Sequence, residues 1–204
     1  MEQGRIEGEH SRVAGVVLAA GASTRFGRNK LLLNFDGESL ARRAARTALS
    51  AALDPVVCVL GHEAERIRKE LAGLPVRVVI NEAPEKGLNS SITAGIAALP
   101  ESAAAAIVQL ADMPFVSAAM LRRLVDAFRR TGAPLVASNY GGIHAPPALY
   151  ARDLFPELAE AEGEGAGRRV ARRHEKELVR VEWPAAALVD VDREEDWKRM
   201  CAAG

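Results

Sequence analysis

The segment VAGVVLAAGASTRFGRNKLLL, residues 13–33, decides the fold of this chain. Its first part, Val13–Ala20, carries no charge and is rich in valine, which is typical of a strand covered on both faces. The glycines and small residues that follow allow close backbone approach and leave amide N–H groups exposed in a loop. Arg25 and Lys30 then add two positive charges. The segment therefore predicts a buried strand that leads into a phosphate-binding loop.

The residues after this segment alternate between strand and helix patterns. The Asp36-Gly37 pair predicts a turn, and Ser39 and Ser117 predict the N-caps of two helices. Such alternation is typical of an α/β protein with a mostly parallel central sheet and helices on both faces. Val76–Ile80 is expected to be a buried strand of that sheet. The other expected strands are Pro55–Leu60, Ala103–Leu110, Leu135–Ser138, Glu177–Glu182 and Ala187–Val189.

Composition limits the class of protein. The 204 residues carry 27 basic and 27 acidic side chains, and this balance excludes the basic face of a nucleic-acid-binding protein. No run is long and apolar enough to predict a signal peptide or a membrane span, and Cys58 and Cys201 suggest no disulfide framework, so we expect a cytoplasmic protein. Residues 1–12 are expected to form a flexible N-terminal extension, and residues 13–204 a single domain.

Asp112 is the acid with the clearest predicted role. It follows the strand Ala103–Leu110, and open α/β sheets bind ligands at the carboxyl ends of their strands. Mg²⁺ is commonly held by one or two carboxylates together with phosphate oxygens. A turn aspartate before Pro114 is the alternative. A second carboxylate can come from Asp190 or Asp192, and we favour Asp192.

Three further features have both a functional and an ordinary interpretation. The polar segment Asn81–Ser91 can bind an anion or a base ahead of a helix, or Ser90 and Ser91 can simply cap that helix. Asn139–Pro147 is predicted to be a loop that faces substrate, and its His144 is expected to be a hydrogen-bonding residue rather than a zinc ligand. The basic cluster Arg168–Lys176 is expected to be a solvated helix face, and the alternative is that its arginines nearest the preceding glycine segment contact an anionic substrate.

Four separated segments carry a resemblance to a known family. They are LAAGASTRFGRNKLLL from Leu18, NEAPEKGLNSSITAG from Asn81, VQLADMP from Val108 and VDVDREEDW from Val189. In this order they resemble the nucleotidyltransferases typified by the molybdenum-cofactor cytidylyltransferases. The resemblance implies a Rossmann-like, glycosyltransferase-A-type fold, dependence on Mg²⁺, and transfer of a nucleoside monophosphate from an NTP to a phosphorylated acceptor, with release of pyrophosphate.

The resemblance also implies roles for individual residues. Arg25, Lys30 and Asp112 would be catalytic, and Asp112 and Asp192 would bind the metal. Ser23 would hold the triphosphate together with Arg25. The remaining residues implied to contact the nucleotide are Leu18, Ala19, Ala20, Gly21, Asn81, Gly87, Ser90 and Ser91.

The choice of base and acceptor depends on short motifs. The guanylyl-transferring branch of the family usually has Leu-Ala-Gly-Gly where this chain has Leu18–Gly21 with an alanine at position 20, which favours CTP. The usual Gly-His-Pro and Gly-Asp-x-Gly-Ala-Arg motifs are replaced here at Ala145–Pro147 and Gly163–Arg168. Molybdopterin is therefore implied as acceptor by the resemblance alone, with a molybdoenzyme or its maturation chaperone as a further partner.

Three alternatives stay open at the level of sequence. The first is a nucleotidyltransferase for a sugar phosphate or another small phosphate, and the second is a guanylyltransferase of the molybdenum cofactor. The third is a module that binds a nucleotide or cofactor and delivers it without catalysis. The presence of both Lys30 and Asp112 argues against the third, because a pure binder needs no metal-aligned α-phosphate.

Overall fold

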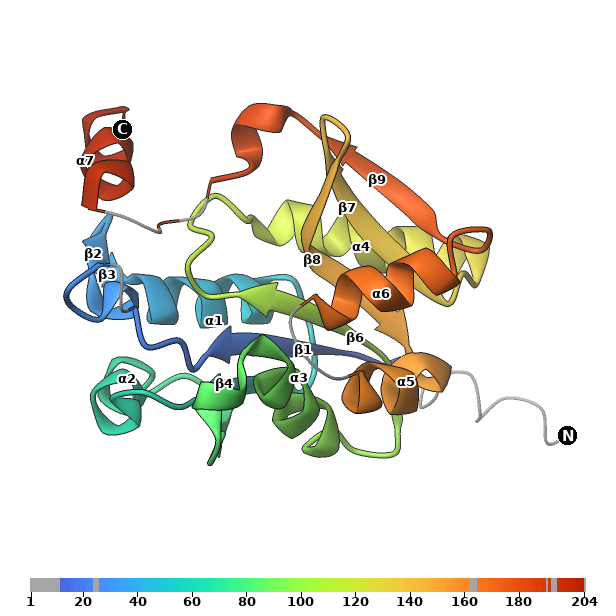
Figure 1. Ribbon diagram of the computed structural model, residues 1–204, viewed down its shortest axis with the longest axis horizontal. Coiled ribbons are helices and arrows are strands. Elements are labelled where there is room, and N and C mark those ends of the chain that lie inside the picture. The colour runs from blue at the N-terminus through green and yellow to red at the C-terminus, as the bar shows by residue number, and fades with distance from the viewer. Residues whose placement is uncertain (1–11, 24–25, 162–164, 190, 192–193, 204) are drawn as a thin grey trace, which may run out of the picture.

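The computed structural model describes residues 12–23, 26–161, 165–189, 191 and 194–203. Arg25, Asp190 and Asp192 therefore lie outside the described residues. Most of the described strands form one seven-stranded sheet, with the order β5-β4-β1-β6-β8-β7-β9 (Figure 1). Its strands are β1 (Arg12–Ala19), β4 (Val56–Leu60), β5 (Arg77–Ile80), β6 (Ala103–Leu110), β7 (Leu135–Tyr140), β8 (Ile143–Ala151) and β9 (Val179–Trp183).

Seven α-helices are described around this sheet. They are α1 (Leu40–Ser50), α2 (Ala64–Glu70), α3 (Leu88–Ala97), α4 (Ala118–Thr131), α5 (Phe155–Glu160), α6 (Ala166–Arg173) and α7 (Glu194–Ala203). The short strands β2 (Asn34–Phe35) and β3 (Glu38–Ser39) form a separate hairpin, and α7 lies beside it in Figure 1. No helix in the described part of the chain is long and apolar enough to cross a membrane.

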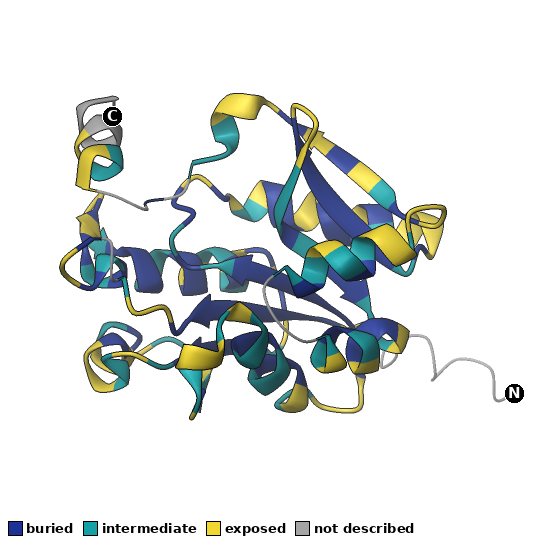
Figure 2. Cartoon of the chain, in the orientation of Figure 1, coloured by how far each residue is buried: buried dark blue, intermediate teal, exposed yellow. Residues whose placement is uncertain are grey.

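The central sheet is mostly parallel, as predicted. β1 pairs in parallel with β4 and β6, β4 with β5, and β7 with β9, whereas β8 runs antiparallel to both β6 and β7. β1 and β6 are central strands, and Figure 2 shows both as mostly buried. The carboxyl ends of β1, β4 and β6 consequently meet at one edge of the sheet.

Alternating residues of β1 face two hydrophobic layers, as the pleat of a strand requires. Val13 and Val17 pack into the layer that contains α1, α2 and α4. Val16 and Leu18 pack into the layer that contains α3, α5 and α6. This arrangement explains the uninterrupted apolar run of the segment, because both faces of the strand are buried. Helices therefore cover both faces of the sheet.

The predicted caps of two helices are confirmed. The Ser39 hydroxyl accepts a hydrogen bond from the Arg42 backbone at the start of α1, and Ser117 does the same from Met120 at the start of α4. Cys58 lies in the core as expected, and burial raises the pKa of its thiol to about 12. The cysteine is therefore a small apolar core residue at neutral pH.

Three predictions about elements are wrong. β5 is an edge strand and is partly exposed, because only β4 pairs with it. The expected loop Asn139–Pro147 is a β-hairpin, in which Gly141 and Gly142 supply the positive φ angles of a two-residue turn between β7 and β8. Ala187–Val189 is not a strand, because Ala187 still belongs to the short 3-10 turn Ala185–Ala187.

Candidate active site

A cleft of about 260 Å³ opens where β1 and β6 end. It lies at the carboxyl edge of the sheet, where open α/β folds place their ligands. Leucine and proline side chains form apolar walls, and polar groups lie beside them. The lining residues are Leu18, Ala20, Gly21, Lys30, Leu31, Pro84, Gly87, Leu88, Ser91, Leu110 and Asp112.

Lys30 and Asp112 form an ion pair in this cleft. The Lys30 Nζ lies 2.5 Å from Asp112 Oδ2, and the two side chains are only 12% and 18% exposed. Lys30 reaches this position because it begins a 3-10 turn whose N-cap, Asn29, accepts a hydrogen bond from the Leu31 backbone. The Lys30 backbone N–H also donates to the Ser23 hydroxyl at 3.2 Å. The glycine-rich loop is thus folded so that its lysine meets the acid at the end of β6.

The backbone around Asp112 is held by neighbouring segments. The Ala111 N–H donates to Leu18 O at 3.1 Å, which ties the end of β6 to the end of β1. The Val191 N–H donates to Asp112 O at the same distance. Asp112 is therefore not merely a turn residue before proline, because its carboxylate contacts Lys30 inside the cleft.

Asn81 fixes one wall of the cleft from behind. It is buried, and its Nδ2 donates to the Ser90 and Ser91 hydroxyls at 2.8 and 2.9 Å. Its Oδ1 accepts from the Ala83 backbone. The Ser90 hydroxyl in turn donates to backbone carbonyls, so these polar side chains form a network that shapes the segment ahead of α3.

The helix-capping interpretation of Ser90 and Ser91 is wrong. The helix α3 begins at Leu88 after Gly87, and no side chain caps its first turn. Ser91 lines the cleft, whereas Ser90 lies behind it in the network with Asn81. Ser90 and Ser91 therefore help to shape one wall of the cleft.

A second hollow, of about 450 Å³, lies on the glycine-rich loop next to the start of α2. Ser23 lines it together with Gly27, Arg28 and Asn29, and His62, Glu63 and Arg66 form its other side. Ser23 therefore lies outside the first cleft but is joined to it by its hydrogen bond with the Lys30 backbone. Ala19 is buried in β1 beneath the loop.

Comparison with known families decides what kind of cleft this is. Residues 15–178 match the family model described as the MobA-like NTP transferase domain. The chain belongs to this family. Its fold is that of the glycosyltransferase-A-type nucleotidyltransferases, which confirms the expected architecture. Membership implies an NTP and a phosphorylated acceptor as reactants.

Two curated relatives illustrate the range of the family. The chain is 33% identical to a protein named nicotine blue oxidoreductase from Paenarthrobacter nicotinovorans, over 82% of this chain and 84% of that protein. It is also 33% identical to a probable molybdenum cofactor guanylyltransferase from Opitutus terrae, over 92% of this chain and 89% of the relative. The family relation therefore covers nearly the whole chain but comes with different assigned activities.

A solved structure gives the same fold with a metal. Rv0371c from Mycobacterium tuberculosis H37Rv superposes with a TM-score of 0.84 at 26% identity, covering 95% of this chain and 99% of that one. The same protein has been solved in complex with manganese, with a TM-score of 0.81 and 25% identity, over 95% of this chain and all of that chain. A structural neighbour of this chain has thus been solved in complex with manganese.

Asp112 fits a role as one ligand of a divalent cation in the MobA-like site. Among the residues that the structure describes, no group of three or more His, Cys, Asp or Glu side chains could hold a metal by itself. Mg²⁺ nevertheless needs only one or two carboxylates when substrate phosphates and water supply the other oxygens. The donor set around Asp112 therefore suits a metal that arrives with a nucleotide rather than a permanently caged ion.

Two further expectations concerned His144, as a hydrogen-bonding residue, and the basic cluster Arg168–Lys176, as a solvated helix face. The contacts of both agree with these expectations. His144 accepts a weak hydrogen bond of 3.4 Å from Arg180 on β9 and belongs to no metal cluster in the described chain. In the basic cluster, Arg173 and His174 contact Glu157 on α5, and Val170 is buried. α6 thus joins the body of the protein through one apolar face.

The sequence did not reveal several residues that line the cleft. Leu31, Pro84, Leu88 and Leu110 form its apolar walls. Leu88 is 47% exposed. Its position directly after Gly87 is the one feature of the sequence that could have indicated that it lines the cleft. An exposed apolar wall offers a surface for the face of a base.

Proposed function

We propose that this protein is a Mg²⁺-dependent nucleotidyltransferase that moves CMP from CTP onto molybdopterin and releases pyrophosphate. The observation that carries the proposal is the Lys30–Asp112 pair, which lies in a cleft at the carboxyl edge of a MobA-like domain. A phosphate-rich ligand and its metal need such a cation and such a carboxylate side by side.

The nucleotide would lie across the cleft. Leu18, Ala20 and Gly21 would border the base and ribose from the side of β1, and the buried Ala19 would support them through the backbone. Gly87 and Ser91 would border them from the side of α3, with Asn81 and Ser90 holding that wall in place. Ser23 and Arg25 would bind the triphosphate in the glycine-rich loop, next to the Lys30 side chain.

The chemistry requires alignment rather than a protein nucleophile. An oxygen of the acceptor phosphate attacks the α-phosphorus in line, a new P–O bond forms, and the bond to the β-phosphate oxygen breaks with its electron pair. Lys30 and Arg25 would stabilise the negative charge that develops on the leaving pyrophosphate. Asp112 would hold the metal with Asp192, whose sequence neighbour Val191 is hydrogen-bonded to the Asp112 backbone. When bound, Mg²⁺ neutralises phosphate charge and orients the triphosphate.

Ala20 supports CTP as the nucleotide. Its side chain borders the cleft, and a Cβ built on Gly61 at the end of β4 would lie only 2.9 Å from the Ala20 Cβ. The methyl group thus takes up space that the first glycine of the Leu-Ala-Gly-Gly motif would leave open in the guanylyl-transferring branch, which favours the smaller pyrimidine. The guanylyltransferase assigned to the Opitutus relative makes GTP the competing nucleotide.

One assay tests this function. The purified protein is incubated with Mg²⁺ and each NTP in turn, with molybdopterin or a sugar phosphate as acceptor, and acceptor-dependent pyrophosphate release is followed. We expect release with CTP and molybdopterin. Faster release with GTP than with CTP would identify guanine as the base in place of cytosine. Release only with a sugar phosphate would identify a sugar phosphate as the acceptor in place of molybdopterin. Absence of release with every pair would overturn the enzyme proposal and favour a delivery module.

A further inference from the structure

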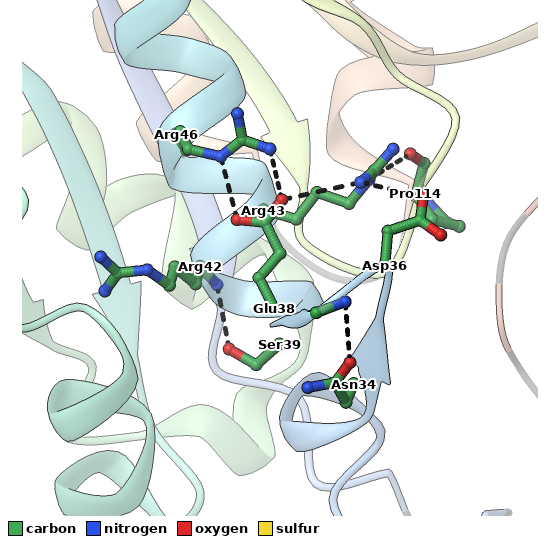
Figure 3. Close-up of polar contacts among 9 residues, drawn as sticks. Asn34, Asp36, Glu38, Ser39, Arg42, Arg43, Arg46 and Pro114 are labelled. Carbon is green, nitrogen blue, oxygen red and sulfur yellow. Dashed lines mark hydrogen bonds and ion pairs between the residues drawn. The ribbon is translucent and has the colours of Figure 1, made fainter.

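We infer that Arg43 is a positioning residue for Asp112, acting through the backbone that follows the aspartate. This inference rests on the proposed function, because it assigns Arg43 the task of fixing a metal-binding carboxylate. Arg43 lies on α1, outside the residues that the sequence motifs mark, and its guanidinium bridges α1, the β2–β3 hairpin and the end of β6 (Figure 3).

The contact with the aspartate segment is direct. Arg43 Nε donates a hydrogen bond of 3.0 Å to the carbonyl oxygen of Pro114, two residues after Asp112. The side chain between them in sequence, Met113, is buried in the core. The peptide that carries Asp112 is therefore held on one side by the Val191 N–H and on the other by a charged donor. A charged donor makes a stronger hydrogen bond than a neutral one.

Arg43 is itself fixed in orientation by its other contacts. Its NH1 lies 3.6 Å from both Asp36 Oδ2 and Glu38 Oε1, and its guanidinium lies 5.0 Å from the centroid of the Phe35 ring. A planar guanidinium can satisfy such partners on several sides at once, whereas a lysine ammonium is a flexible point charge. These contacts orient the Arg43 guanidinium, and its hydrogen bond then holds the Pro114 carbonyl in place.

Arg46 provides a matched comparison on the same helix. It also pairs with Glu38, with its Nε 2.9 Å from Glu38 Oε2, but it has no contact with Pro114 among the hydrogen bonds of the described residues. The hydrogen bond from Arg46 lowers the pKa of Glu38, and the charge of Arg43 acts in the same direction. Both arginines therefore stabilise the hairpin, but only Arg43 reaches the aspartate segment.

The test measures metal binding without turnover. Mn²⁺ and CTP are titrated together, without acceptor, into wild type, Arg43→Gln, Arg43→Lys, Arg46→Gln and Asp112→Asn, and protein-bound Mn²⁺ is followed by electron paramagnetic resonance. Losing a residue that orients a metal ligand commonly costs about 10- to 100-fold in metal affinity or activity. We expect a loss in this range for Arg43→Gln and Arg43→Lys, and wild-type affinity for Arg46→Gln. Thermal melting checks that each variant is folded, and Arg43→Lys provides a charge-conserving variant if Arg43→Gln does not fold.

The kinetic result expected is a higher Mg²⁺ concentration for half-maximal rate, because Arg43 does not line the nucleotide cleft and acts through the metal-binding carboxylate. Equal Mn²⁺ affinity in the Arg43 variants and in Arg46→Gln would overturn the inference and leave the proposed function intact, provided that Asp112→Asn binds Mn²⁺ more weakly. Unchanged Mn²⁺ affinity in Asp112→Asn would instead overturn the proposed metal role, and the inference about Arg43 with it.

Discussion

Lys30 and Asp112 show how burial can bring two ordinary residues together as a candidate site. Each residue taken alone could be a surface charge, but their side chains are mostly shielded and only 2.5 Å apart. Their attraction is therefore less screened than that of an exposed pair. A lysine in this position can neutralise a triphosphate without a large loss of solvation at the moment of reaction.

At this scale, replacing Lys30 with Ala should slow transfer rather than unfold the protein. Loss of one preorganised charge that stabilises a developing anion typically lowers kcat by about 100- to 1,000-fold. The measurement is the rate of pyrophosphate release together with the melting temperature, with the exposed Lys69→Ala as control. A Lys30→Ala protein with normal specific activity and a lowered melting temperature would show that Lys30 serves stability alone.

At the scale of elements, α3 carries the proposed nucleotide wall and packs closely on the sheet through Gly95. A Cβ built on Gly95 would lie 2.4 Å from Val16 Cγ1 on β1 and 3.1 Å from Val59 Cγ2 on β4. Alanine would gain up to about 1 kcal/mol in helix propensity. Overpacking a tight core costs about 1–3 kcal/mol, so we expect the packing loss to exceed the gain.

Gly95→Ala should therefore lower the free energy of unfolding, measured by urea denaturation. Because the helix must move away from β1, its first turn should also move, and the KM for CTP should rise. Gly21→Ala is the comparison for stability, since a Cβ there meets no atom within 4 Å. Equal or higher stability of Gly95→Ala would show that α3 can shift without cost.

The junction of α5 and α6 should respond to pH. A hydrogen bond with His174 is the main cause that lowers the pKa of Glu157, and Arg173 adds a second contact at 2.8 Å. A carboxylate with a lowered folded-state pKa stabilises the protein at neutral pH, and this stabilisation is lost as the pH falls below the usual glutamate range. Partly exposed pairs of this kind contribute about 1 kcal/mol at most.

Urea denaturation of Glu157→Gln at two pH values measures this contribution. The variant should be less stable than wild type at pH 7, and the difference should be smaller at a pH below the ordinary glutamate pKa of about 4.3. Glu160→Gln, an exposed change on the same helix, should show no such trend. A difference that persists at low pH would mean that Glu157 acts through packing rather than charge.

At the scale of the whole molecule, one sheet unites the two hydrophobic layers. Residues of β1 contribute to both layers, so neither layer can come apart without exposing the other side of the strand. A third, smaller cluster joins Phe26, Phe35 and Val191 to the partly buried Trp197 of α7. The C-terminal helix is thereby attached beside the hairpin that also holds Arg43.

This architecture predicts a single cooperative unfolding transition. Trp183 lies in the layer of α1 and α4, and Trp197 contacts Phe35 at a ring distance of 6.2 Å. In Trp197→Phe, tryptophan fluorescence reports on Trp183 of β9, and circular dichroism reports on the helices. The two urea transitions should coincide if residues 13–204 form one domain. Separate midpoints would divide the chain into two folding units.

Much of this arrangement followed from local rules. The valine run of β1 had to be buried on both faces, and Ser39 and Ser117 had only one sensible role at their helix starts. The meeting of Lys30 with Asp112 was also predictable in outline, because the carboxyl ends of neighbouring parallel strands share an edge.

Other features depend on pairing and distance, which local patterns do not contain. Nothing in Val76–Ile80 reveals that β5 has a neighbour on one side only. The paired glycines of Asn139–Pro147 suit a loop and a hairpin equally, and pairing with β7 decides between them. Arg43 resembles any helix arginine until its partners, far away in sequence, are known. Arg25 and Asp192 lie outside the described residues, so their roles stay predictions.

The most direct test of the account is the rate of acceptor-dependent pyrophosphate release by wild type and Asp112→Asn. With CTP, molybdopterin and Mg²⁺, the substitution should reduce this rate by at least about 100-fold, because the carboxylate proposed to hold the metal is lost while the side-chain shape is kept. Asp126→Asn on the exposed side of α4 should behave as wild type. An Asp112→Asn protein that is folded and as fast as wild type would contradict the account.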